Sequence, residues 1–167
     1  LSSACAVIAK YHYYDKSSPE EVLAMKGVDF DMELGESLKT DRSYLFGKLL
    51  ATLEQVERDV LNSKKEDRET NAIRLQSAFV SHPFTTWKVL EEALIPYYQQ
   101  LHPKRKAVYR AEIEEIAESL LGLYVENDGN VEIQLNRALT ETYLLGYYLQ
   151  RKALREKIYK KKDAEEN

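Results

Sequence analysis

Residues 43–60 of this chain read SYLFGKLLATLEQVERDV, and this segment decides the fold. Its apolar residues recur at steps of four and three, the spacing that places side chains on one face of an α-helix. Such a face is stable only when it is buried against other elements. Asp41 or Ser43 can cap the N-terminus, since either side chain can accept a hydrogen bond from a free backbone N–H. The apolar face consists of Leu45, Leu49, Leu53, Val56 and Val60.

Four later segments carry the same helical periodicity. The first should end at His82, because the residue before Pro83 avoids the helical region of backbone space. The second should start at Thr85 or Thr86, and Pro96 inside it is expected to kink the helix or to mark its weaker half. The predicted helices span residues 70–79, 85–101, 103–123 and about 132–161, and an Asn-Asp-Gly-Asn turn at 127–130 separates the last two.

Apolar and polar residues alternate nowhere for long enough to predict a β-strand. The predicted fold class is therefore all-α, an antiparallel helical bundle. Residues 1–40 differ in character, with short helices predicted at 2–14 and 20–26 and then an acidic connector. We expect a short helical extension with this connector at 1–40 and a helical bundle domain at 41–167. Since the chain begins at Leu1, we also expect it to be a piece of a longer protein.

The composition excludes several classes of protein. Cys5 has no second cysteine to pair with, so no internal disulfide can form and the reducing cytoplasm is the expected compartment. No apolar run approaches the roughly 18 residues of a membrane-spanning helix. The formal net charge of −4 argues against a dedicated nucleic-acid-binding protein, but acidic and basic residues are concentrated in separate segments.

No set of residues predicts an active site. The three histidines lie far apart in the sequence, and neither a metal-binding spacing nor a glycine-rich phosphate loop occurs. We therefore expect no catalytic residue, no metal and no cofactor. One alternative stays open, a small helical nuclease that would hold magnesium with Asp29, Asp31 and Glu33. These acids fall in a predicted loop without an organised partner.

Two basic clusters favour binding to an anionic partner. The first stands at the predicted start of a helix, where positive charge opposes the helix macrodipole. Charge placed against local stability invites a functional explanation. This cluster consists of Lys104, Arg105 and Lys106, with Arg110 one turn further on.

The second cluster lies in the last predicted helix, where residues 144–154 read LLGYYLQRKAL. Gly146 costs about 1 kcal/mol relative to alanine inside a helix, so we expect a close helix contact there. Tyr147 and Tyr148 are left open between the edge of the core and base stacking. The basic residues that follow suit contacts with phosphates, and they are Arg151, Lys152 and Arg155.

Three segments, by their order and spacing, resemble a known family. Residues 43–57 (SYLFGKLLATLEQVE), 71–87 (NAIRLQSAFVSHPFTTW) and 144–154 (LLGYYLQRKAL) are similar to the C-terminal helical domain of the large subunit of type I-C CRISPR Cascade. The resemblance covers about residues 41–159. It implies a non-catalytic, small-subunit-like domain of an RNA-guided antiviral surveillance complex. In such complexes base pairing reads the sequence, and protein contacts the DNA backbone through charge.

The resemblance also implies partners and a mode of synthesis. The partners are the DNA strands of the R-loop, the crRNA-containing complex and the other Cascade subunits, including its backbone and large subunits. In this family the small subunit can be made from an internal start, for which Met32, or else Met25, is suitably placed. Together with the basic clusters, the resemblance predicts backbone contacts by Arg74, Lys104, Arg105, Lys106, Arg110, Arg151, Lys152 and Arg155, with a weaker one by Lys48.

The alternative is a purely structural module that docks protein subunits without touching nucleic acid. The net charge of −4 favours this alternative. Salt-dependent binding of the domain to single-stranded DNA distinguishes the two functions, since a docking module should show little of it.

Overall fold

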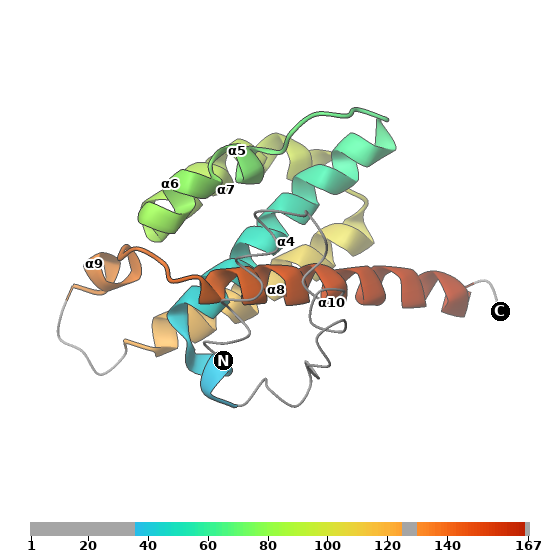
Figure 1. The fold of residues 1–167 in the computed structure, drawn as a ribbon. Helices are drawn as coiled ribbons and strands as arrows, with labels where there is room; N and C mark the ends of the chain where they lie inside the picture. Colours follow the sequence, from blue (N-terminus) through green and yellow to red (C-terminus); the bar gives the residue numbers. More distant parts are fainter. Residues whose placement is uncertain (1–35, 125–129, 166–167) are drawn as a thin grey trace, which may run out of the picture.

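The computed structural model of the chain describes residues 36–124 and 130–165. All regular secondary structure within these residues is helical, which confirms the predicted all-α bundle. The short helices predicted at 2–14 and 20–26, and most of the acidic connector and of the predicted turn, lie outside the described residues. In chain order the elements are the 3₁₀ helix η1 (Glu36–Thr40) and the α-helices α4 (Arg42–Ser63), α5 (Asn71–Arg74), α6 (Gln76–Ser81), α7 (Pro83–Gln100), α8 (Pro103–Gly122), α9 (Val131–Leu135) and α10 (Thr142–Glu165) (Figure 1).

α4 is the central helix of the bundle. Asp41 caps its N-terminus, because the Asp41 carboxylate accepts a hydrogen bond from the Tyr44 amide at 2.8 Å. Every residue of the predicted apolar face is buried, with at most 4% of its surface exposed. Burial extends further around the helix, to Phe46, Leu50 and Glu57, because α10, α8 and α7 all pack against it. A helix covered on several sides must be apolar or internally paired on each of them.

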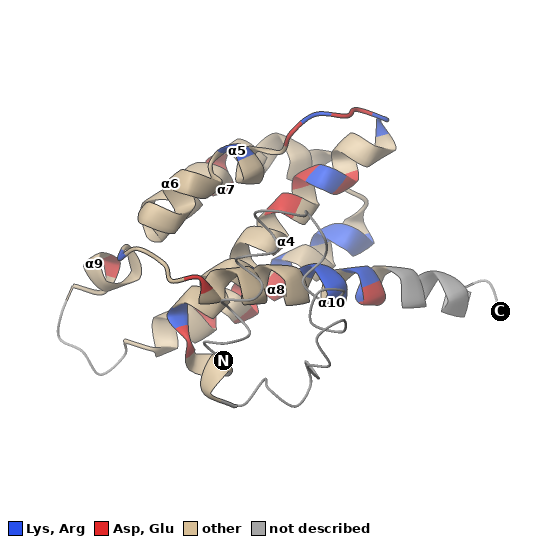
Figure 2. Cartoon of the chain, in the orientation of Figure 1, with Lys and Arg blue, Asp and Glu red and all other residues tan. Residues whose placement is uncertain are grey.

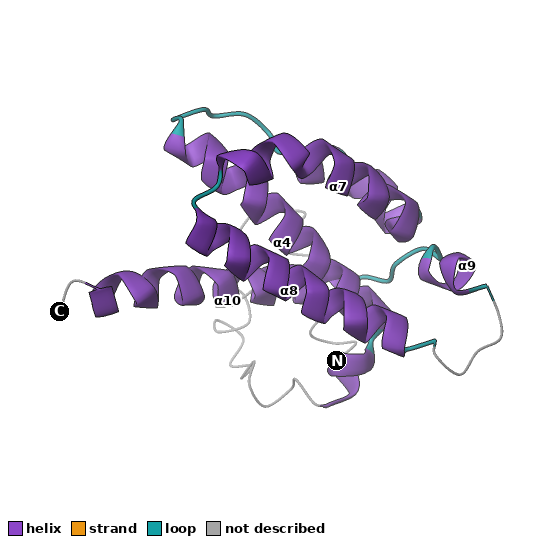
Figure 3. Cartoon of the chain, turned by 180° about the vertical axis from the view of Figure 1, so that it is seen from behind, coloured by secondary structure: helices purple, strands orange, loops and turns teal. Residues whose placement is uncertain are grey.

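The other helices surround α4 from different directions. α8 runs in the opposite direction to α4 (Figure 1). α10 crosses in front of α4 in Figure 1 and lies behind it in Figure 3, which shows the opposite side of the molecule. Aromatic rings join α4 to α6 and α7, since Phe46 packs edge-on against Phe79 and Trp87 with ring centroids 5.8 and 6.4 Å apart. No described helix combines the length and the apolar composition that crossing a bilayer requires.

α4 and α10 approach most closely where each carries a glycine. A Cβ atom added at Gly146 would overlap the Tyr44 carbonyl oxygen of α4. One added at Gly47 would overlap the Tyr143 carbonyl oxygen of α10 and lie 2.9 Å from the Tyr147 amide nitrogen. The obstructing atoms are backbone atoms of a packed helix, so only glycine fits at either position. The close helix contact predicted at Gly146 is confirmed, and Gly47 is its counterpart on α4.

Two predicted helix boundaries are wrong. The first of the four later helices is two short ones, α5 and α6, because Leu75 between them leaves helical geometry at φ −98° and ψ 6°. α7 begins at Pro83 rather than at Thr85 or Thr86, since the fixed φ of proline suits the first turn of a helix. α7 also continues through Pro96 without ending there.

The single helix predicted at 132–161 is wrong as well. It is divided into α9 and α10 by an irregular segment at 136–141. The Leu139 amide in this segment donates a hydrogen bond to the Val80 carbonyl of α6 at 2.8 Å. Because that amide is committed to a distant partner, it cannot make the bond to the residue four positions earlier that a continuous helix needs.

The N-terminus of α4 holds the same irregular segment in place. The Ser43 hydroxyl accepts a hydrogen bond from the Thr140 amide at 3.0 Å. The Arg42 guanidinium donates to three backbone carbonyls, those of Leu135 at 3.1 Å, Arg137 at 2.6 Å and Ala138 at 2.9 Å. The break between α9 and α10 is therefore stabilised by contacts with residues more than ninety positions earlier in the chain.

Replacing either crossing glycine by alanine should lower the free energy of unfolding by about 3 kcal/mol or more, because the methyl group would displace backbone rather than a flexible side chain. Alanine is otherwise the better helix former by about 1 kcal/mol, so this effect opposes helix propensity. Chemical denaturation of Gly47→Ala and Gly146→Ala, followed by circular dichroism, measures the change.

Gly122 at the end of α8 provides the matched control. A Cβ atom there meets nothing within 4 Å, so Gly122→Ala should leave stability unchanged or raise it by up to about 1 kcal/mol. Equal stabilities of Gly122→Ala and Gly146→Ala would contradict the close crossing.

Candidate nucleic-acid interface

The first basic cluster lies in the first turn of α8, as predicted. The His102 imidazole caps this helix, since its Nδ1 accepts a hydrogen bond from the Lys104 amide at 3.3 Å. Lys104 is exposed and Lys106 is half-buried. Positive charge at this end of a helix opposes the macrodipole, so the helix dipole does not favour basic residues here.

Arg105 is held by an ion pair within the bundle. Its guanidinium Nη1 lies 2.7 Å from Oδ2 of Asp59 on α4, and 37% of its side chain is exposed. The Asp59 carboxylate also accepts hydrogen bonds from the buried Tyr109 hydroxyl and, at 3.1 Å, from the Gln55 amide. Arg105 thus fixes the start of α8 to α4, and Asp59 balances much of its charge.

Arg110 faces a different helix from Arg105. Its guanidinium carbon lies 5.9 Å from the ring centroid of the half-buried Tyr98 on α7. Burial, followed by the charge of Glu91, raises the pKa of Tyr98 to about 12, although the positive charge of Arg110 acts in the opposite direction. The first cluster is therefore divided between two sides of α8, with Arg105 against α4 and Arg110 against α7.

The basic residues of α10 differ in their surroundings. Lys152 and Arg155 are exposed, and neither forms an ion pair within the described residues. Arg151 is half-buried, and its guanidinium carbon lies 5.5 Å from the ring centroid of Tyr147. Among the basic side chains of α10 whose surroundings the structure describes, Lys152 and Arg155 are consequently the most available to a partner.

The two tyrosines beside this cluster have different roles. Tyr147 is 7% exposed, and its hydroxyl donates to the Glu54 carboxylate of α4. Burial, together with the negative charge of Glu54, raises the pKa of Tyr147 above its ordinary value. Tyr148 is half-buried and meets the Tyr147 ring edge-on, with centroids 5.1 Å apart. Tyr147 is therefore a core residue, and Tyr148 lies at the edge of the core.

Lys157, absent from the sequence prediction, forms an ion pair with Glu112 of α8. Gln150 donates to the other oxygen of this carboxylate at 2.8 Å. Burial acts to raise the pKa of Glu112, but the hydrogen bonds from Lys157 and Gln150 and the charges of Lys157 and Lys48 outweigh it, so the pKa is lowered. The weaker candidate Lys48 is half-buried on α4 and acts on this internal carboxylate. Because Lys157 and Glu112 lie on different helices, no sequence spacing indicates their contact.

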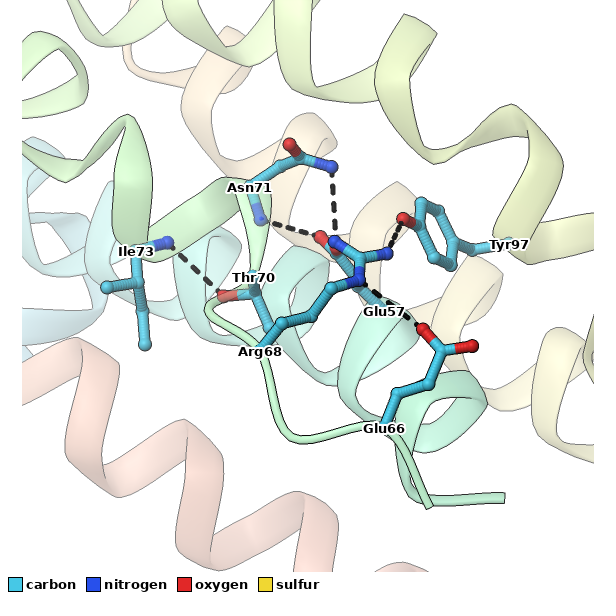
Figure 4. A network of polar contacts seen from close by, with 7 residues as sticks. All are labelled: Glu57, Glu66, Arg68, Thr70, Asn71, Ile73 and Tyr97. Atoms are coloured by element: carbon cyan, nitrogen blue, oxygen red, sulfur yellow. Dashed lines mark hydrogen bonds and ion pairs between the residues drawn. The ribbon is translucent and has the colours of Figure 1, made fainter. Parts of the chain in front are cut away.

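Arg74 is exposed on α5, away from both clusters in the sequence. A polar network fixes the start of α5 to α4 (Figure 4). The fully buried Glu57 carboxylate accepts a hydrogen bond from the Asn71 amide at 2.7 Å and pairs with Arg68 at 3.2 Å. Arg68 also donates to the Tyr97 hydroxyl of α7. The network positions the helix that carries Arg74 without involving Arg74 itself.

The charged side chains are distributed unevenly over the bundle. Figure 2 shows basic residues at the start of α8 and near the middle of α10, on the same side of the molecule in this view, whereas α6 carries no charge. Several acids are instead used internally, because Glu54, Glu57 and Asp59 of α4 each pair with an arginine. Because each of these pairs is neutral, they leave the net charge of −4 unchanged, and the two basic clusters are local features of an acidic chain.

The described part of the chain contains no group of three or more His, Cys, Asp or Glu side chains placed to hold a metal ion. The nuclease hypothesis depends on Asp29, Asp31 and Glu33, which lie outside the described residues. The possible start residues Met25 and Met32 lie outside them as well.

Residues 2–155 match the sequence model of the family described as CRISPR-associated protein (Cas_Csd1). The chain belongs to this family. It is accordingly a CRISPR-associated protein, and the matched residues include both basic clusters. Neither a curated protein nor a solved structure matches the chain.

Glu112 should make the stability of this Cas_Csd1 chain sensitive to acid. Its pKa is lower in the folded than in the unfolded state, so its contribution is complete above the ordinary value of 4.5 and is lost as the pH falls through the folded value. Glu112→Gln should lower the free energy of unfolding by about 2 kcal/mol at neutral pH. This loss should become smaller as the pH falls below about 4.5. Urea denaturation over a pH series measures both quantities.

Glu118→Gln, an exposed position on the same helix, is the control. The free energy of unfolding of Glu118→Gln should differ from that of the unmodified chain by the same amount at every pH. A difference between the unmodified chain and Glu112→Gln that stays constant down to pH 3 would refute the role of the ionised carboxylate.

Proposed function

We propose that this CRISPR-associated chain is a non-catalytic, small-subunit-like domain of a type I-C Cascade complex that holds the DNA strands of the R-loop. The observation that carries the proposal is the exposure of Lys152 and Arg155 on α10, without an ion-pair partner among the described residues. Unpaired exposed cations are available to phosphates. Membership of the Cas_Csd1 family supports the assignment to a CRISPR complex.

The charges would act through the DNA backbone rather than through bases. In RNA-guided complexes the guide reads the sequence by base pairing, so the protein needs only to neutralise phosphates and keep the strands apart. Each lysine or arginine that contacts a phosphate releases a condensed counterion, which makes the affinity fall steeply with salt. Lys104, Lys106, Arg110 and Arg74 would extend the contact beyond α10. The remaining partners would be the crRNA-containing complex and other Cascade subunits in the cytoplasm.

Docking of other protein subunits, without DNA contact, is the second candidate function. Residues 75–87 contain no Asp, Glu, Lys or Arg. Two apolar side chains on α7 are also open to solvent, Val89 with 49% and Ile95 with 54% of its surface exposed. An uncharged segment and exposed apolar side chains favour contact with protein rather than with phosphate.

Removing the two exposed cations of α10 should weaken binding to single-stranded DNA. If Lys152 and Arg155 each contact one phosphate, Lys152→Ala/Arg155→Ala should reduce the slope of log K against log salt by about 1.4 and the affinity at 0.1 M salt roughly 20-fold. Fluorescence anisotropy of a labelled oligonucleotide, titrated with the full chain at several salt concentrations, measures both.

Lys88→Ala/Arg137→Ala removes the same charge from exposed positions in α7 and after α9. This control should change the affinity by less than about twofold. Equal losses in the two double variants would indicate a non-specific effect of net charge, and the absence of salt-dependent binding by the unmodified chain would favour the docking function.

A further inference from the structure

The contact between α4 and α10 contains a carboxylate that joins both helices. Glu54 of α4 is only 3% exposed, and each of its oxygens has a partner. Oε2 accepts a hydrogen bond from the Tyr147 hydroxyl of α10. Oε1 lies 3.0 Å from Nη2 of Arg58, one turn further along α4. Glu54 and Tyr147 thus form a fixed polar pair between the two helices.

Two arginines lie against this pair. Arg58 contacts its carboxylate, whereas Arg151 lies over its aromatic ring, with the guanidinium carbon 5.5 Å from the ring centroid. Both side chains remain partly open to solvent, and 31% of the Arg58 side chain is exposed. One cation therefore contacts the buried carboxylate, and the other lies over the ring of the tyrosine that is hydrogen-bonded to it.

The geometry leaves hydrogen-bond donors available on both arginines. A guanidinium carries five N–H groups in a planar fork, and the contact of Arg58 with Glu54 uses the Nη2 end. Arg151 uses the face of its guanidinium on the Tyr147 ring, so the N–H groups at its edge stay free for an anion. Because Glu54 holds the Tyr147 hydroxyl, the ring under Arg151 is fixed in position. The planar fork of each arginine matches the oxygens of a phosphate.

We infer that Arg58 and Arg151 form a two-arginine site, organised by Glu54 and Tyr147, that binds the phosphate backbone of single-stranded DNA. The inference rests on the proposed DNA-holding function and adds Arg58 to it as a contact residue. In this arrangement Glu54 is a positioning residue. It orients Arg58 and Tyr147, and its negative charge also limits the affinity of the site.

Arg58→Ala should remove one phosphate contact. The slope of log K against log salt for a labelled oligonucleotide should fall by about 0.7, and the affinity at 0.1 M salt about fivefold. Arg58→Lys keeps the charge and should retain the slope while recovering only part of the affinity, since lysine lacks the planar fork. A purely structural role of Arg58 would lower thermal stability without changing the salt slope.

Glu54→Gln tests the site from the opposite direction. The glutamine carbonyl can still accept the Tyr147 hydrogen bond, but the site gains one unit of positive charge, so the affinity should rise about two- to fivefold. Glu92→Gln, at an exposed position on α7, removes the same charge elsewhere and should have a smaller effect. Thermal unfolding of each variant identifies those that fail to fold.

The outcomes separate this inference from the proposed function. If Lys152→Ala/Arg155→Ala weakens binding while Arg58→Ala leaves both slope and affinity unchanged, the two-arginine site is refuted and the DNA-holding function stands. If the unmodified chain shows no salt-dependent binding, the proposed function itself fails. A loss in Arg58→Ala together with a gain in Glu54→Gln establishes the site.

Discussion

The crossing of α4 and α10 is the contact on which the rest of the structure depends. With Gly47 on one helix and Gly146 on the other, the two backbones approach until a single methyl group would collide. This proximity lets Tyr147 reach the buried Glu54 carboxylate and lets Gln150 bridge α4 and α8. A wider separation would leave those buried polar groups unpaired, at a cost of about 1–3 kcal/mol each. The buried polar groups are therefore paired only because the two helices pack this closely.

The polar interior determines what the surface can do. Four carboxylates are buried or nearly so, and each is paired with a cation from its own helix or from a neighbouring element. They are Glu54, Glu57 and Asp59 of α4 and Glu112 of α8. Breaking such a pair by removing one partner is more costly than the pair itself is stabilising. The acids are thereby withdrawn from the surface, while Lys152 and Arg155 stay on it. Local clustering of such cations lets an acidic chain present a basic region to a polyanion.

Part of this organisation is visible in the sequence and part is not. The period of Leu45, Leu49 and Leu53 predicts the buried face of α4 correctly, because burial repeats with the helical turn. The break between α9 and α10 was not predicted, since Leu135, Leu139 and Tyr143 continue the helical spacing across it. Its cause is Arg42 and Ser43, which bind backbone groups of that segment from the other end of the domain. The sequence likewise predicted Arg105 as a backbone-contacting cation, whereas the structure pairs it with Asp59.

By itself, the sequence determined the all-α class, the apolar face of α4, the glycine contact at residue 146 and the family, because each depends on residues close together along the chain or on their order. The tertiary structure alone decided which charges are free. Lys152 and Arg155 remain available, whereas Arg105 and Lys157 pair with Asp59 and Glu112 on other helices. The physical reason is that the pairing of a charge depends on its distance in space to an opposite charge, and helix packing sets that distance independently of separation in the sequence.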